Sequence, residues 1–298
     1  MMPDFGLLDP RTIRELAAEL ALRPTKQRGQ NFVHDPNTVR RIVATSGISA
    51  ADHVLEIGPG LGSLTLGLLE TGAQVTAIEI ESSLARRLPL TIAERLPAAR
   101  GRVAVLEADA LSVSRLPDPQ PTAVVANLPY NVSVPVLLHV LATFSTIASG
   151  LVMVQAEVAD RLVAPPGSKT YGVPSVKLAW FCTARRVGSV PPSVFWPVPN
   201  VDSGLVALRR HPAPTTTAPR QQVFAVVDAA FGQRRKMLRA ALAGLFGSSA
   251  AAVTALVAAG VDPQARGEVL DVNAFARIAE QLPVGIGRRG VPSAESMS

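Results

Sequence analysis

Short apolar runs alternate with helical stretches from residue 53 onward, and this alternation constrains the fold more than any other feature of the sequence. The predicted strands cover residues 53–57, 74–80, 103–106, 122–126 and 150–155, and the predicted helices between them cover 63–71, 83–95 and 133–144. Strands joined by helices pair in parallel through right-handed crossovers. We therefore predict an α/β fold with a doubly wound sheet, and segments near 174–187 and 203–209 are candidates for additional edge strands.

The sequence outside this sheet divides into segments of different character. An amphipathic pattern before Pro24 predicts one short helix, and Asp35 followed by Pro36 predicts the start of a helix over 36–46. A stretch rich in Pro and Thr predicts a linker, and the pattern beyond it is helical. The predicted organisation is an N-terminal extension (1–24), an α/β domain (25–210), a linker (211–219), a small all-helical domain (220–285) and a disordered tail (286–298).

Composition and charge narrow the classes of function. The 298 residues carry a formal net charge of +6, and a basic protein attracts polyanions such as nucleic acids. The single cysteine, Cys182, excludes an internal disulfide, and the four histidines show no metal-ligand spacing, so we predict no metal site. We find no signal-peptide pattern and no apolar run long enough to span a membrane, and we expect a cytoplasmic protein without a membrane partner.

A Gly-rich turn after the first predicted strand indicates a cofactor site. Glu56 precedes Gly58 and Gly60, which allow a sharp turn and close approach of a ligand, and Glu79 ends the next strand about 20 residues later, where a carboxylate suits ribose hydroxyls. A dinucleotide, and hence an oxidoreductase, is one alternative, and an ordinary tight turn is another. Glu56 would repel a pyrophosphate but suits the cationic amino group of S-adenosyl-L-methionine, which we favour. Asp109, after the third strand, is a candidate acceptor for the adenine amino group of the cofactor, or alternatively a helix N-cap.

Asn127-Leu128-Pro129-Tyr130 follows the fourth predicted strand, at the edge of the sheet where open α/β folds bind ligands. The amide oxygen of Asn127 and the carbonyl of Leu128 can accept both N–H bonds of an exocyclic adenine amino group, which turns its nitrogen lone pair toward a methyl donor. Pro129 fixes the local φ, and Tyr130 can stack on the base. An ordinary strand-to-helix turn is the alternative. The tetrapeptide thus predicts methyl transfer to adenine N6, driven by positioning, with no general base assigned.

Several motifs in order resemble the ribosomal RNA adenine dimethyltransferases, and most closely their small-subunit (KsgA/RsmA) branch. The resemblance covers roughly residues 24 to 280 and rests on Gly29–Phe32, Glu56–Gly62, Asn127–Asn131, Gly167–Gly172, Phe195–Ser203 and Phe231–Lys236. It implies a Rossmann-like class I S-adenosylmethionine methyltransferase sheet with a C-terminal helical RNA-binding domain. By resemblance the cofactor contacts are Asn31, Val33, Gly58, Glu79, Asp109 and Asn127, with Val33 standing where the family usually has Leu, and Phe195 is an aromatic residue beside the target base.

The resemblance also implies a reaction and a partner. The family's small-subunit branch transfers four methyl groups to two adjacent adenines in the 3′-terminal hairpin loop of 16S rRNA, within the immature 30S subunit, during ribosome biogenesis. Two predicted basic surfaces suit rRNA phosphates: one contains Lys26 and Arg28, and the other, on a helical face, contains Arg234, Arg235, Lys236 and Arg239. A solvated charged face is the alternative for these residues. We expect no DNA partner. Two rival functions remain: methylation of 23S rRNA of the macrolide-resistance type, and a non-catalytic role in ribosome assembly.

Overall fold

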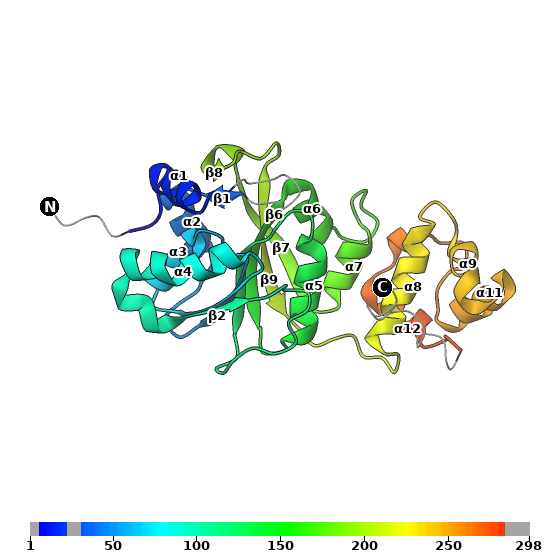
Figure 1. Cartoon of the computed structure of the whole chain (residues 1–298). Coiled ribbons are helices and arrows are strands. Elements are labelled where there is room, and N and C mark those ends of the chain that lie inside the picture. Colours follow the sequence, from blue (N-terminus) through cyan, green and yellow to red (C-terminus); the bar gives the residue numbers. More distant parts are fainter. Residues whose placement is uncertain (1–5, 23–30, 284–298) are drawn as a thin grey trace, which may run out of the picture. The chain divides into compact units, whose positions relative to one another are not determined.

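A seven-stranded sheet forms the centre of the first part of the protein, as described by a computed structural model that covers residues 6–22 and 31–283 (Figure 1). Its strands are β2 (His53–Ile57), β3 (Gln74–Glu79), β4 (Val103–Glu107), β5 (Ala123–Asn127), β6 (Ser149–Gln155), β7 (Cys182–Val190) and β9 (Ser203–Arg210). Their spatial order is β4-β3-β2-β5-β6-β9-β7. The pairs from β4 to β6 are parallel, whereas β9 runs antiparallel to both β6 and β7. The predicted doubly wound α/β sheet is confirmed.

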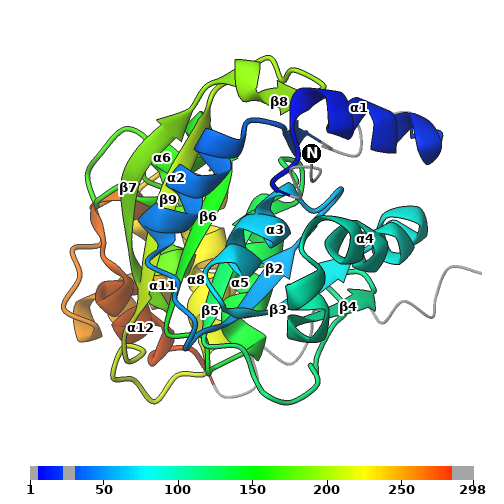
Figure 2. The same ribbon diagram turned by 90° about the vertical axis from the view of Figure 1, so that its left-hand side faces the viewer.

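Helices cover both faces of this sheet because its central strands are apolar on both sides. In Figures 1 and 2, α2 (Pro36–Ser46), α3 (Ser63–Glu70) and α4 (Ser82–Arg95) lie on one face, and α5 (Ser133–Thr143) and α6 (Ala156–Leu162) lie on the other. All five residues of β2 are buried, as expected for a central parallel strand. The helix predicted over residues 36–46 begins as expected, with the Asp35 carboxylate accepting a hydrogen bond from the Thr38 amide (2.8 Å).

A two-stranded ribbon lies beside the sheet. It pairs β1 (Phe32–Val33) with β8 (Phe195–Trp196) in antiparallel register, and a 3-10 turn (Pro192–Val194) precedes β8. The helix predicted before Pro24 is α1 (Pro10–Glu19), whose N-cap is Asp9. Its buried residues join the same hydrophobic core as Phe32 and Val33. Pairing with β8 and burial in this core therefore hold Phe32 and Val33 in place.

The chain divides into two compact units, of which the first holds the sheet. Within its described residues, the regular elements of the second unit are all helices. It contains α7 (Val173–Ala179), α8 (Arg220–Gly232), α9 (Leu238–Ala241), α10 (Ala243–Phe246), α11 (Ser249–Ala258) and α12 (Val272–Ala279), with a 3-10 turn at Gly267–Val269. Aromatic edge-to-face contacts join its parts: the Phe224 ring on α8 lies 6.1 Å from that of Trp180 and 6.2 Å from that of Phe181.

The structure corrects one element and moves one boundary. The segment near 174–187, predicted as an edge strand, is helical over Val173–Ala179 and becomes a strand only from Cys182. Residues 164–181 belong to the second unit, so the α/β unit comprises the chain up to residue 163 together with residues 182–211. Residues 211–219, predicted as a linker, contain no helix or strand. No helix within the described ranges is long and apolar enough to cross a membrane.

Candidate active site

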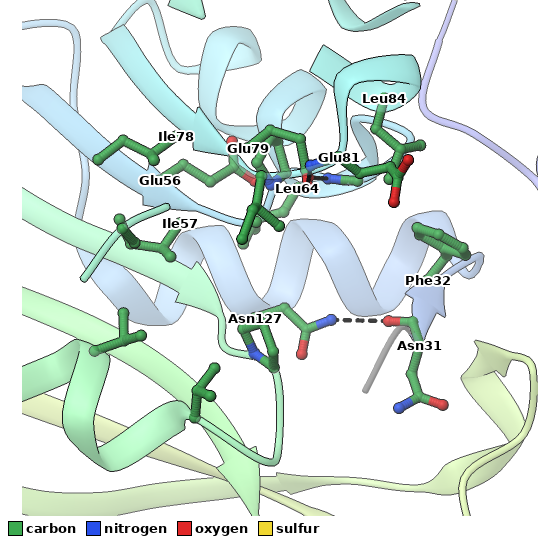
Figure 3. Close-up of a pocket in the computed structure, with 18 of the residues that line it drawn as sticks. Asn31, Phe32, Glu56, Ile57, Leu64, Ile78, Glu79, Glu81, Leu84 and Asn127 are labelled. Atoms are coloured by element: carbon green, nitrogen blue, oxygen red, sulfur yellow. Dashed lines mark hydrogen bonds between the residues drawn. The ribbon is translucent and has the colours of Figure 1, made fainter. Parts of the chain in front are cut away.

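A cavity of about 530 Å³ opens at the carboxyl ends of β2, β3 and β5 (Figure 3). This is the point at which the strand order reverses, because β2 is flanked by β3 on one side and β5 on the other. The cavity is lined by Asn31–Val33, Glu56–Leu61, Ser63, Leu64, Ile78–Glu81, Leu84, Ala108–Leu111, Asn127, Pro129, Asn131, Val132 and Val136. The predicted cofactor residues Asn31, Val33, Glu56, Gly58, Gly60, Glu79, Asp109 and Asn127 all lie in this lining.

The Gly-rich turn packs against the β1–β8 ribbon. Gly60 has φ +58°, a conformation that residues with a Cβ rarely adopt, and a Cβ at this position would lie 2.7 Å from the Phe32 ring. The Phe32 ring itself lies 6.3 Å from that of Trp196, in a stacked arrangement. Only glycine therefore satisfies both the turn and the aromatic wall beside it.

Glu79 organises the neighbouring backbone from the end of β3. One carboxylate oxygen accepts a hydrogen bond from the Gly60 amide (3.1 Å), and the other accepts one from the Glu81 amide (3.0 Å). Burial raises the pKa of Glu79, whereas these backbone amides act in the opposite direction. Each carboxylate oxygen has more than one lone pair, so these bonds leave acceptor capacity for a ligand.

Glu56 is the most deeply buried carboxyl in the cavity wall. It is 1 % exposed, and the Thr65 hydroxyl on α3 donates a hydrogen bond to it (2.7 Å). Burial raises the pKa of Glu56 to about 8, against the opposing effect of the Thr65 bond, and the nearby Glu79 carboxylate raises it further. At neutral pH the group is therefore largely protonated, and a bound cation beside it would favour the ionised form.

Asn127, at the end of β5, is held in one orientation. Its side-chain nitrogen donates a hydrogen bond to the backbone carbonyl of Asn31 (2.9 Å; Figure 3). A carbonyl can only accept, so this bond fixes which end of the amide is the oxygen. Among the described residues none donates to that oxygen, and none donates to the carbonyl of Leu128, whose own amide bonds to the Met153 carbonyl (3.0 Å). Two acceptors are thus available in adjacent residues.

Tyr130 follows at the turn before α5. It is half-buried and does not line the cavity; its hydroxyl is hydrogen-bonded to the Ser203 hydroxyl at the start of β9 (2.7 Å). Burial raises the pKa of Tyr130, so the phenol is neutral at physiological pH. Its ring is thus the partly accessible aromatic surface of the Asn127–Tyr130 segment.

Phe195 does not take the place predicted for it. The prediction puts this ring beside the target base, but Phe195 is 0 % exposed, belongs to the hydrophobic core and does not line the cavity. Side chains alternate across a strand, and in β8 it is Trp196 that faces Phe32 while Phe195 turns inward. Phe195 is therefore a residue of the hydrophobic core and not the second aromatic ring beside the target base.

Other residues were anticipated in part or missed. Asp109 is exposed at the cavity, and its carboxylate accepts a hydrogen bond from the Leu111 amide (2.9 Å), so it stabilises a turn as well. Sequence reasoning missed Ile80 and Leu111, apolar residues in the lining that are 68 % and 39 % exposed. The position of Ile80, an apolar residue directly after Glu79 at the end of a strand, could have indicated that it lines the cavity.

The predicted basic helical face is not formed as expected. Residues 233–236 are a turn between α8 and α9, and only Arg239 lies in a helix. Arg234 forms an ion pair with Glu268 (3.0 Å) and donates to the Lys169 carbonyl (2.8 Å), so this guanidinium is engaged within its own unit. Arg235, Lys236 and Arg239 are exposed. Lys26 and Arg28 lie outside the described residues. No group of three potential metal ligands occurs within residues 6–22 and 31–283.

The sheet order, with one reversed strand, and the cavity at its switch point define the Rossmann-like fold of the S-adenosylmethionine methyltransferases. A dimethyladenosine transferase from Plasmodium falciparum shares this fold, with a TM-score of 0.69 over 83 % of this chain and 95 % of that chain, at 23 % identity. The 23S rRNA methyltransferase ErmE matches with a TM-score of 0.61 over 85 % of this chain and 99 % of that chain, at 28 % identity.

The family described as ribosomal RNA adenine dimethylase matches residues 22–283. Proteins named ribosomal RNA small subunit methyltransferase A are similar over nearly the full length. That of Cutibacterium acnes is 62 % identical, covering 94 % of this chain and 96 % of its own, and that of Streptomyces coelicolor is 64 % identical, covering 93 % and 97 %. The chain belongs to the ribosomal RNA adenine dimethylase family.

Proposed function

We propose that this protein uses S-adenosyl-L-methionine to dimethylate the N6 atoms of two adjacent adenines in the 3′-terminal hairpin loop of 16S rRNA, within the immature 30S subunit. The observation that carries the proposal is the orientation of Asn127, whose amide nitrogen is occupied by the Asn31 carbonyl while its oxygen remains an acceptor. The small-subunit relatives, at 62 % and 64 % identity, support this substrate over 23S rRNA.

The residues around the cavity fit the methyl donor. When bound, S-adenosylmethionine supplies a methyl group on a positively charged sulfur. Glu79 offers carboxylate lone pairs to ribose hydroxyls, Asp109 offers an acceptor to an adenine amino group, and Glu56 suits a nearby cationic amino group. The exposed apolar side chains of Ile80 and Leu111 offer flat contacts for a purine ring. Asn31, Val33, Gly58 and Gly60 complete the proposed set.

The Asn127–Tyr130 segment prepares the target adenine for transfer. In the first transfer the Asn127 side-chain oxygen and the Leu128 carbonyl accept the two N6–H bonds, and in the second transfer one of them accepts the single remaining N6–H bond. Both arrangements direct the nitrogen lone pair away from the ring plane. Pro129 restricts the backbone between them, and Tyr130 stacks on the base, a contact worth about 1–3 kcal/mol. The contribution of these residues is positioning: each transfer leaves a positively charged N6, which loses its proton to solvent after the methyl bond has formed, so none of them needs to act as a general base.

Basic residues in two segments are the proposed contacts to rRNA phosphates. Arg235, Lys236 and Arg239 lie in and after the turn that follows α8, and Lys26 and Arg28 precede β1. Adenines in a hairpin loop are easier to extrude than paired ones, which suits a site that must take the target base out of its stack. The chain's net charge of +6 is consistent with this partner.

The test is transfer of labelled methyl groups to immature 30S particles from cells that lack this protein, followed by nuclease digestion and mass spectrometry. N6,N6-dimethyladenosine in the 3′-terminal hairpin is expected from the wild-type chain. The Asn127→Ala variant should lose activity by about 100-fold or more, since it removes both the acceptor and the fixed geometry. The matched control is Asn37→Ala, an exposed amide on α2, with activity near that of wild type.

Three results would contradict the proposal. Label in 23S rRNA would reassign the substrate. Full methylation by Asn127→Ala would remove the proposed mechanism. Intact cofactor binding without any transfer would favour an assembly role without catalysis.

A further inference from the structure

The hydroxyl–hydroxyl contact between Tyr130 and Ser203, which lie 73 residues apart in the chain, joins two of the sequence motifs. Tyr130 is the last residue of the Asn127–Tyr130 segment. Ser203 is the last residue of the Phe195–Ser203 segment, to which the proposed cofactor and base contacts assign no role. The oxygen–oxygen distance is 2.7 Å, a normal length for a hydrogen bond between hydroxyls.

Ser203 sits on a rigid part of the sheet. It is the first residue of β9, between β6 and β7, with Gln155 opposite it on one side and Val190 on the other. The side chain is 0 % exposed. The adjacent Gly204 allows α6 to pack closely on this point, because a Cβ there would lie 2.5 Å from the Cβ of Ala159. A hydroxyl in this position is held by two strand ladders and one helix.

Tyr130 needs such an anchor more than the other residues of its segment. Asn127 is the last residue of β5 and is fixed by Asn31, and Leu128 is buried and bonded to Met153. Tyr130 lies in a turn, is only half-buried and must hold its ring at a defined position if a base is to stack on it. A small displacement of that ring would misplace the base relative to the Asn127 and Leu128 acceptors.

We propose that Ser203 is a positioning residue for the target adenine: its hydroxyl holds the far end of the Tyr130 ring at the position where the base stacks. This inference rests on the proposed function, and it adds a residue from outside the Asn127–Tyr130 segment to the base site. Ser203 acts through Tyr130 and does not itself touch the base.

A double-mutant cycle on methylation of immature 30S particles tests the coupling. Ser203→Ala and Tyr130→Phe each remove one partner of the bond and should each lower kcat by about threefold to tenfold, the effect of losing one ordinary hydrogen bond. The KM for 30S particles should change little, because phosphate contacts dominate RNA affinity. The double variant should be no slower than the slower single variant.

A matched control separates positioning from general loss of a buried hydroxyl. Thr76→Val removes a buried hydroxyl that is bonded to His53 (2.8 Å) on β3 of the same sheet, away from the cavity lining. It should lower thermal stability and leave kcat near the wild-type value.

A spectroscopic readout follows the base directly. 2-Aminopurine at the target adenine position of a hairpin RNA lacks the N6 amino group, so its quenching reports stacking on Tyr130 without the Asn127 and Leu128 contacts. Ser203→Ala should give brighter fluorescence in the complex than wild type. The inference is overturned if folded Ser203→Ala retains wild-type kcat and quenching, or if the losses of the two single variants multiply in the double variant. Absence of 16S methylation by the wild-type chain would instead overturn the proposed function, so the two failures are distinguishable.

Discussion

At the scale of single residues, the buried carboxyl of Glu56 makes the stability of the protein depend on pH. Its pKa is raised to about 8, mainly by burial, from an ordinary value of 4.5. Between these two pH values the folded protein holds the proton and the unfolded chain releases it. Glu56 therefore makes its full contribution to the stability of the folded state below about pH 4.5, and this contribution decreases progressively as the pH rises toward 8.

Replacing Glu56 by Gln should remove this dependence. The melting temperature of Glu56→Gln relative to wild type should rise steadily from pH 5 to pH 8, measured without cofactor by calorimetry. Glu280→Gln is a control of opposite sign, because hydrogen bonds from Thr216 and Thr217 lower the pKa of Glu280. This substitution should lower the melting temperature only above the acidic pH range in which the Glu280 carboxyl is protonated. A constant difference between Glu56→Gln and wild type across this range would contradict the assignment.

Residue types and spacing predicted the cavity well but not the partners of each side chain. The predicted cofactor residues between Glu56 and Asn127 stand at strand ends, which a doubly wound sheet brings together at one cavity. The burial of Phe195 depends on the face that a two-residue strand presents, and a pattern that short has no readable period. The Arg234–Glu268 pair and the Tyr130–Ser203 bond depend on tertiary proximity between segments 34 and 73 residues apart, which the sequence alone does not reveal.

At the scale of elements, the turn from β2 to α3 depends on its contact with the β1–β8 ribbon. Substituting Gly60 by Ala forces a left-handed φ on a residue with a Cβ and drives that atom against Phe32. We expect strain of about 1–3 kcal/mol and weakening of S-adenosylmethionine binding by about tenfold or more. Isothermal titration calorimetry and thermal unfolding measure the two effects.

Gly101→Ala is the matched control for this element. Gly101 lacks a positive φ and has open space around it, so both its cofactor affinity and its melting temperature should stay near wild type. Unchanged affinity in Gly60→Ala would show that the turn tolerates displacement of Phe32.

Regular elements with a clear period were predictable, and elements that change type within a few residues were not. The strands and helices from 53 to 155 appear within one or two residues of their predicted ends, because apolar runs and turn residues alternate distinctly there. The first half of the segment from Val173 to Val190 is mostly apolar, interrupted by Ser175 and Lys177. Its helix is decided by packing against α8 and α12, through contacts such as Lys177–Asp228 (2.7 Å), which no local pattern encodes.

At the scale of the whole molecule, the chain leaves the α/β unit at residue 164, returns at 182 and leaves again at 212. The helical unit is therefore built from two separate stretches of sequence, and the Tyr171 hydroxyl donates to the Leu270 carbonyl (2.7 Å) across 99 residues. The helical unit does not consist of a C-terminal segment alone, so a chain cut at residue 211 would leave α7 without its partners. Function in this unit has to be tested by point substitution in the full chain.

The proposed rRNA contacts of the helical unit predict a specific change in salt dependence. Replacing Arg235, Lys236 and Arg239 together by Gln should weaken binding to immature 30S particles. It should also reduce the slope of log affinity against log salt by about 2 to 3, since each lost phosphate contact contributes about 0.7–0.9. Arg234→Gln is the matched control: it should leave the slope unchanged and lower the stability of the unit, because Glu268 loses its partner and the Lys169 carbonyl its donor. Filter binding at several salt concentrations distinguishes the two variants. An unchanged slope in the triple variant would mean that these three cations are solvated surface charges and that rRNA is held elsewhere on the protein.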